Sequence, residues 1–299
     1  MKDRIYQFMD KLRNWVMPIL HFLLQFWKNN PAYLICSVCY FLVCCCILKH
    51  FFLLLIIYVA FLLIGFSSLG EKLLRLLNHV RPLETKREIE YLQPLFEEVY
   101  LHTKEVYTYK LPNIQICIID NMTVNAMALG RHTIAVTKGA MKTFTEDELK
   151  AVMAHEMAHI VYGDTIASLY TLIGNGFFSA FVLFARFCLL LLDWLQNVFT
   201  KKRGFLFSFI FLIQLLFEAV IFIFNFGLQV ILSVNRRKNE FWADGFSYSI
   251  GYDTDMIEAL YLLEKISLGD NSTIIQKMTA SHPRITLRIK KLEEMEEQM

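Results

Sequence analysis

The pentapeptide HEMAH at residues 155–159 constrains the fold of this chain more than any other stretch. Two imidazoles four residues apart face the same way on a helix, where they can close on one metal ion. Neutral imidazole nitrogens suit Zn²⁺ at roughly 2.0–2.1 Å. Glu156 would lie beside the ion and could take a proton from a zinc-bound water, whose pKa falls to about 7. The motif therefore predicts a helix carrying two zinc ligands, His155 and His159, and a general base, Glu156.

The residues before the motif predict where this helix begins. A single HExxH can occur by chance on an amphipathic helix, so its surroundings matter. Thr145 is followed three residues later by Glu148, which is the pattern of a capping box. Thr145 would cap the first turn, and Glu148 would reach back to it. Both histidines then fall well inside the helix.

A catalytic zinc site needs a third protein ligand, and Glu240 is the best candidate. Glu240 and Asp244 are also four residues apart and would share one face of a helix. In one interpretation both acids are solvated, beside the basic run 236–238. In the other, Glu240 binds zinc and Asp244 accepts the free N–H of a ligating imidazole, which fixes its tautomer. The HExxH motif elsewhere in the chain favours the second interpretation.

Four segments form a recognisable set, namely Asn125–Gly130, Ile134–Gly139, Glu146–Asp164 and Glu240–Asp244. Together they resemble the HtpX-like membrane metallopeptidases, which are relatives of the CAAX prenyl proteases. The resemblance runs from about residue 111 to residue 164 and resumes from residue 235 to about residue 292. It implies a mainly α, α+β metalloprotease domain of the gluzincin type that carries a small β-sheet.

The same resemblance assigns roles to individual residues. It implies one Zn²⁺ per chain, held by His155, His159 and Glu240, with Glu156 as the general base. Asp244 would support a ligating histidine. The aspartate five residues past the second histidine matches Asp164, which we interpret as structural.

Two residues near the end of the chain are further candidates. The stretch Ser281-His282-Pro283, followed by Arg288-Ile289, is similar to the Ser/Thr-His-Pro and Arg-Ile residues of the family. His282 or Arg288 could donate a hydrogen bond to the oxyanion of a tetrahedral intermediate. Alternatively, Ser281 caps the last helix, with Pro283 in its first turn and Arg288 solvated.

The segment Asn125-Ala126-Met127-Ala128 is the candidate for binding a peptide substrate. A short strand with an unpaired edge can bind an extended peptide through backbone hydrogen bonds, and the resemblance implies this role. The residues alone fit an ordinary internal strand equally well. A small sheet is expected from about Asn113 to Thr137, and helical periodicity predicts helices over 254–266 and 285–297.

Composition predicts the environment of the chain. Hydrophobic residues make up 56% of it, including 26 Phe, and its mean hydropathy is +0.41. That is too apolar for an ordinary soluble domain, and some apolar runs are long enough to cross a bilayer. We therefore expect a multi-pass membrane protein. The formal charge is only +2 and no basic stripe alternates with aromatic residues, which argues against nucleic acid as a partner.

Hydropathy predicts four membrane spans, at Ala32–Leu48, Phe51–Ser67, Thr165–Ala185 and Phe205–Asn235. The first two form a hairpin or one long tilted helix. The other two separate His159 from Glu240. Because both residues must reach the same zinc, the chain between them must cross the membrane an even number of times.

The spans divide the chain into five segments. These are a cytoplasmic or interfacial segment 1–31, a transmembrane hairpin 32–68, a first catalytic part 69–164, a second hairpin 165–235, and a second catalytic part 236–299 that holds the third zinc ligand. Lys and Arg flank both ends of the first hairpin, which predicts that the catalytic parts face the cytoplasm. The basic run 201–203 conflicts with this orientation, but early helices usually dominate.

The leading hypothesis is a membrane-bound zinc endopeptidase that cleaves peptide bonds at the cytoplasmic membrane face. Its partners would be the lipid bilayer and polypeptide substrates, especially unfolded or misassembled membrane proteins, as in quality control. The resemblance implies a bacterial cell membrane. One alternative is a dedicated maturation protease for a lipidated or hydrophobic peptide. A non-enzymatic alternative is a membrane chaperone or binding module on the same fold.

Overall fold

The computed structural model describes residues 28–48, 67–107, 111–166, 205–267 and 283–298, with isolated positions between 52 and 63 and between 183 and 195. The described helices are α2 (Pro31–Leu48), α4 (Ser68–Leu77), α5 (Lys86–Val106), α6 (Lys138–Thr143), α7 (Glu146–Tyr162), α9 (Phe205–Ser249), α10 (Asp253–Ser267) and α12 (Ile285–Glu296). The strands are β1 (Val80–Pro82), β2 (Gln115–Ile119), β3 (Ala126–Leu129) and β4 (Thr133–Thr137). The predicted helices over 254–266 and 285–297 are therefore confirmed within one or two residues.

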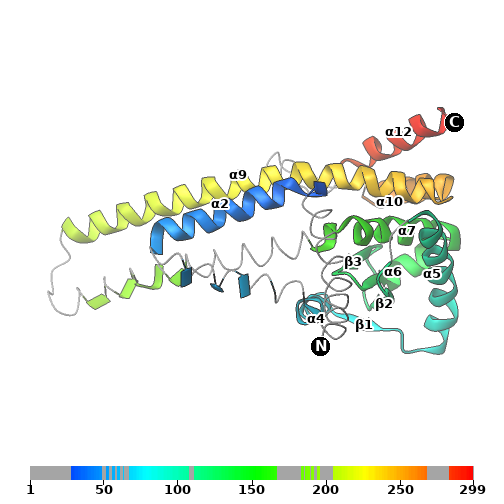
Figure 1. Cartoon of the computed structure of the whole chain (residues 1–299), viewed down its shortest axis with the longest axis horizontal. Helices are drawn as coiled ribbons and strands as arrows, with labels where there is room; N and C mark the ends of the chain where they lie inside the picture. Colours follow the sequence, from blue (N-terminus) through cyan, green and yellow to red (C-terminus); the bar gives the residue numbers. More distant parts are fainter. Residues whose placement is uncertain are drawn as a thin grey trace, which may run out of the picture.

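The four strands form one mixed sheet in the order β1-β2-β4-β3 (Figure 1). β2 and β4 pair in parallel, while β1 and β3 pair antiparallel with their neighbours. The predicted sheet region contains β2, β3 and β4. β1 was not predicted, because a three-residue strand that ends in proline shows no alternating pattern. β3 lies at an edge of the described sheet, so the alternative of an internal strand is wrong.

Helix α7 forms the centre of the globular part, which consists of residues 80–107, 111–166, 236–267 and 283–298. Its capping box is present as predicted, because Thr145 accepts from the backbone of Glu148 and Glu148 accepts from the backbone of Thr145. Gly163 ends the helix with φ 82°, a left-handed conformation that glycine adopts without strain. α7 contacts α5, α9, α10 and β3, so apolar residues are buried on several of its faces.

Helix α9 links an elongated apolar part of the molecule to the globular part (Figure 1). Its first half runs beside α2, and its last turns contact α7, α10 and α12. The start of α2 is held against α9 by Asn30, whose side-chain oxygen accepts from Asn235 at 3.0 Å and from Asn239 at 2.9 Å. The residue after Asn239 is Glu240, so α9 positions the predicted third ligand.

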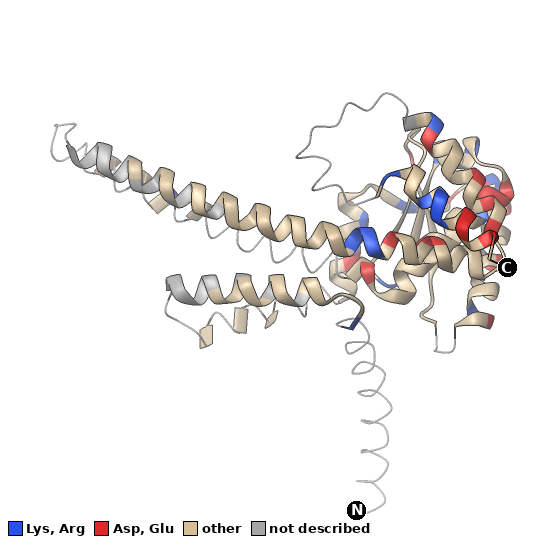
Figure 2. Ribbon diagram, turned by 90° about the horizontal axis from the view of Figure 1, so that it is seen from above, with Lys and Arg blue, Asp and Glu red and all other residues tan. Residues whose placement is uncertain are grey.

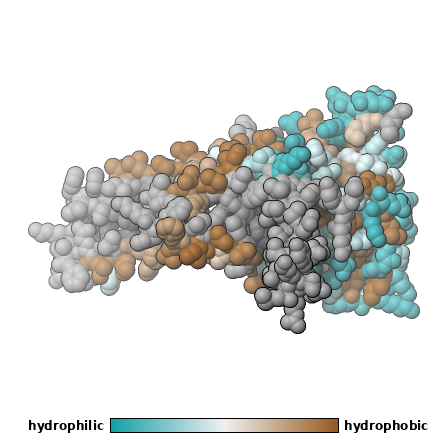
Figure 3. All heavy atoms as spheres, viewed as in Figure 1, coloured by the Kyte–Doolittle hydropathy of each residue, from teal (hydrophilic) through white to brown (hydrophobic). Residues whose placement is uncertain are grey.

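Charge and hydropathy divide the molecule in the same way. In Figure 2 the charged residues gather on the globular part, whereas the described residues of α2 and of the first half of α9 include few of them. The described residues that are visible on the elongated part in Figure 3 are mostly apolar. No helix within the described ranges qualifies as long and apolar enough to cross a membrane. Most of the predicted spans 51–67 and 165–185 lie outside these ranges, and all four spans stay predictions.

Candidate metal centre

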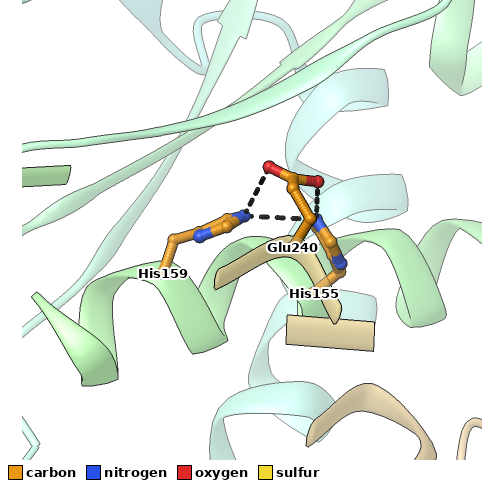
Figure 4. Close-up of side chains that lie close together, drawn as sticks. All are labelled: His155, His159 and Glu240. Carbon is orange, nitrogen blue, oxygen red and sulfur yellow. Dashed lines mark hydrogen bonds and ion pairs between the residues drawn. The ribbon is translucent and has the colours of Figure 1, made fainter. Parts of the chain in front are cut away.

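Three side chains from two helices meet beside the sheet (Figure 4). His155 and His159 come from α7, and Glu240 comes from α9. Their ligand atoms all lie within 4.8 Å of one another. The two Nε2 atoms are 3.2 Å apart, and the Glu240 carboxylate lies 3.5 Å from His155 Nε2 and 3.6 Å from His159 Nε2. The structure thus brings the three predicted ligands together.

The chemistry of this donor set fits a zinc ion. Two imidazole nitrogens and one carboxylate oxygen are a known three-residue ligand set for catalytic zinc, which leaves a further position for water or substrate. Burial lowers the pKa of His155, but hydrogen bonds to Asp244 and Glu240 outweigh burial and raise it to about 10. The pKa of His159 is also raised, because Asp164 and Glu240 outweigh its burial. The carboxylates therefore stabilise positive charge at the imidazoles, as suits a divalent cation.

Each histidine has its own supporting carboxylate on the side away from the meeting point. Asp244 Oδ1 lies 2.9 Å from His155 Nδ1, and Asp164 Oδ2 lies 3.2 Å from His159 Nδ1. When Nδ1–H donates to a carboxylate, Nε2 presents its lone pair to a metal ion. Asp244 was predicted to make such a contact. For Asp164 only a structural role was expected, and its spacing from His159 was the one signal of the contact.

Arg288 of α12 lies against Asp244, the carboxylate that supports His155. Its Nε donates to Asp244 Oδ2 at 2.7 Å and its Nη2 donates to Oδ1 at 2.5 Å, while Nη1 lies 3.4 Å from Glu240 Oε2. The side chain is buried, so the alternative of a solvated Arg288 is wrong. Burial alone would raise the pKa of Asp244, but Arg288 outweighs it and lowers that pKa. The guanidinium therefore keeps Asp244 ionised and oriented toward His155.

The structure tests the other predictions for residues 281–284 only in part. His282 and Ser281 lie outside the described residues. The last helix begins at Ile285, and its N-cap is Arg284, which makes no side-chain capping hydrogen bond. The part of the alternative that places Pro283 in the first turn of this helix is therefore wrong, whereas the predicted cap by Ser281 falls on a residue outside the described ranges.

Replacement of Arg288 by lysine tests how the centre is supported. Lysine keeps the charge but cannot make the two-pronged contact with Asp244. We expect Arg288→Lys to weaken zinc binding roughly 10–100-fold, as is typical when a group that orients a metal ligand is lost. Competition with a chromogenic chelator measures the zinc dissociation constant. Arg284→Lys, at an exposed position near the start of α12, is the matched control.

The same variant separates two roles for Arg288. If zinc affinity is unchanged while kcat falls, Arg288 acts on the oxyanion, which is one of the alternatives that the sequence left open. If affinity and kcat are both unchanged, neither role holds.

Glu156 and the edge strand β3 lie side by side. Glu156 projects from α7 between the two histidines in sequence and is half-buried. Its Oε2 accepts a hydrogen bond from the backbone N–H of Ala128 at 2.7 Å. The predicted substrate segment Asn125, Ala126, Met127 and Ala128 thus includes three residues of an edge strand that touches the predicted general base.

Comparisons with known proteins point in one direction. The sequence model of peptidase family M48 matches residues 87–296 of this chain. The chain is 29% identical over 226 residues to Protease HtpX of Idiomarina loihiensis, covering 70% of this chain and 76% of that protein. It is 28% identical over 219 residues to a Protease HtpX homolog of Bacillus subtilis, covering 67% of this chain and 69% of that protein.

A solved structure shows the same fold. The crystal structure of S. mikatae Ste24p matches with a TM-score of 0.53 and 19% sequence identity. The match covers 94% of this chain and 67% of that one. At this identity the likeness concerns the fold alone.

Proposed function

The chain belongs to peptidase family M48 and is a metallopeptidase, and from this we propose that it is a membrane-bound, zinc-dependent endopeptidase that acts at the cytoplasmic membrane face. The observation that carries the proposal is the meeting of His155, His159 and Glu240 beside Glu156 and the edge strand β3. Zinc ligands, a carboxylate base and a strand able to bind a peptide backbone are the parts that peptide hydrolysis requires.

The residues of the site divide the work as follows. His155, His159 and Glu240 would hold Zn²⁺, which when bound acts as a Lewis acid on the peptide carbonyl and acidifies a water molecule. Glu156 takes the proton of the attacking water and passes it to the departing amine. Asp244 and Asp164 keep the imidazoles oriented. β3 aligns the substrate through its backbone, so selection by side chain is loose.

Loose selection suits a protease that removes unfolded or misassembled membrane proteins. The elongated part supports a membrane location, because large apolar side chains are exposed along it. They include Ile35, Val38 and Leu42 on α2, and Leu212, Leu215, Leu216, Val220, Phe222 and Ile223 on α9. Exposed apolar surface of this extent is stabilised by lipid and is costly in water. The basic residues at both ends of the first predicted hairpin favour a cytoplasmic site.

Metal removal tests the proposal directly. We expect the protein, purified in detergent, to cleave casein and to lose this activity when 1,10-phenanthroline strips its zinc. Activity should return when the chelator is removed by dialysis and about one equivalent of Zn²⁺ is added. Cleavage products would be followed by mass spectrometry. Cleavage that persists after the zinc content has fallen to background would contradict the proposal.

A further inference from the structure

Helix α4 has two chemically different faces. Four leucines, Leu69, Leu73, Leu76 and Leu77, are each more than half exposed. Their spacing of four, three and one residues places them in a single stripe along the helix. Glu71 lies about half a turn away from the centre of this stripe, at roughly 100° per residue. α4 therefore presents leucines outward and a carboxylate inward.

The inward face holds the turn between β3 and β4. Glu71 is buried, and its carboxylate accepts from the Thr133 hydroxyl at 2.6 Å and lies 2.9 Å from His132 Nδ1. Arg75, one helical turn later, contacts Glu71 at 3.2 Å and donates to the Thr133 hydroxyl at 2.8 Å. Burial acts to raise the pKa of Glu71, but hydrogen bonds from Thr133 and His132 outweigh it and lower the pKa. The ionised carboxylate of Glu71 thus binds the turn through hydrogen bonds.

The backbone of the turn leaves room for the Glu71 carboxylate. Gly130 has φ 60°, and a Cβ atom there would lie 2.8 Å from Glu71 Oε2. Any larger residue would strain the backbone and push the carboxylate away. Gly130 directly follows β3, whose Ala128 contacts Glu156. The position of α4 is therefore linked through Glu71 to the strand beside the general base.

The outward face fits a lipid surface. Large apolar side chains are also exposed at the described positions that precede α4 in the sequence, namely Phe52, Leu53, Ile56, Val59 and Leu63. Lys72 is exposed at the border of the stripe, where it can reach lipid phosphates. Figure 1 places α4 on the side of the globular part from which α2 and α9 extend. This combination is typical of a helix that lies in a membrane interface.

We propose that the leucine face of α4 docks on the membrane surface and that Glu71, on the opposite face, thereby holds the edge strand β3 in place beside Glu156. The membrane would then be a part of the substrate site, because it fixes the strand that binds the peptide. This inference rests on the proposed function, since it assumes that the chain is anchored in a bilayer.

Photo-crosslinking in lipid nanodiscs tests the docking. The full chain is prepared with Leu73→p-benzoylphenylalanine, and the matched control carries the same change at Leu101, an exposed leucine on α5. We expect lipid adducts at position 73 and none at position 101. Adducts at position 73 to another segment of the chain, or no adducts there, would overturn the docking.

Hydrogen exchange in the same nanodiscs tests the link to β3. We expect Leu73→Glu and Glu71→Gln each to speed exchange of the β3 amides roughly tenfold. Leu73→Glu weakens the docking of α4 on the membrane, and Glu71→Gln weakens the contact of α4 with the turn that follows β3. Leu101→Glu should leave exchange unchanged, and Glu71→Gln should keep the lipid adducts at position 73. If Glu71→Gln leaves the β3 amides as protected as in the wild type, Glu71 does not link α4 to the strand.

The proposed function is measured separately in these samples. If the Leu73→p-benzoylphenylalanine protein forms lipid adducts while the wild type binds no zinc and cleaves nothing, the proposed function is refuted and the docking is supported. If the wild type binds zinc and cleaves casein while the Leu73→p-benzoylphenylalanine protein forms no lipid adducts, the docking alone is refuted.

Discussion

A Glu156→Gln protein is expected to bind zinc normally and to cleave peptides roughly 10²–10⁴-fold more slowly than the wild type, which is the usual contribution of a general base. Glutamine has nearly the same shape, and its amide oxygen can still accept the hydrogen bond from the Ala128 backbone. It cannot take a proton from the attacking water. The change therefore removes the proton transfer and leaves the metal ligands and β3 in place.

The measurement pairs kcat/KM for a fluorogenic peptide with zinc content on the same preparation. Glu146→Gln is the matched control, because Glu146 is an exposed glutamate in the first turn of the same helix α7. We expect the control to behave as the wild type. If Glu156→Gln cleaves as fast as the wild type, either another group is the base or the activity belongs to a contaminant. Equal loss of zinc and of cleavage would indicate a structural role for Glu156.

The parts of the fold that local signals determine were predictable from the sequence. Thr145 and Glu148 form the predicted capping box, and α7 begins where they place it. Likewise α10 and α12 follow from helical periodicity, because one face of each is buried. β1 was missed since its three residues are specified by pairing with β2, which is a tertiary contact.

The candidate site divides in the same way. The spacing of His155 and His159 is a local signal, and the need for a third ligand pointed to Glu240. Arg288 was a candidate only through the Arg-Ile resemblance, and no local signal predicted its contact with the distant Asp244, against which α12 packs it. A lone arginine on a charged helix is solvated in most proteins. Only the tertiary structure shows that this one is buried against a carboxylate.

The third ligand gives the other large expected effect. Glu240→Ala should weaken zinc affinity by more than the roughly 10–100-fold that follows when a group supporting a ligand is lost. The reason is that this change removes a donor to the ion itself. Cleavage should fall with zinc occupancy. The geometric reason is that the Glu240 carboxylate lies within 3.6 Å of His159 Nε2 and is the acid from α9 in the three-residue cluster.

Because Glu240 also lies 3.4 Å from Arg288, its removal alters the charge balance of a buried site. A second variant, Glu240→Gln, keeps the shape of the side chain. Thermal melting of both variants then shows whether zinc was lost because the ligand is missing or because the protein no longer folds. Glu258→Ala, at an exposed position on α10, is the matched control. A folded Glu240→Ala protein that still binds one zinc with wild-type affinity would show that α9 does not supply the third ligand. A folded Glu240→Ala protein that has lost both zinc and cleavage would instead establish that α7 and α9 together make the metal centre on which peptide cleavage depends.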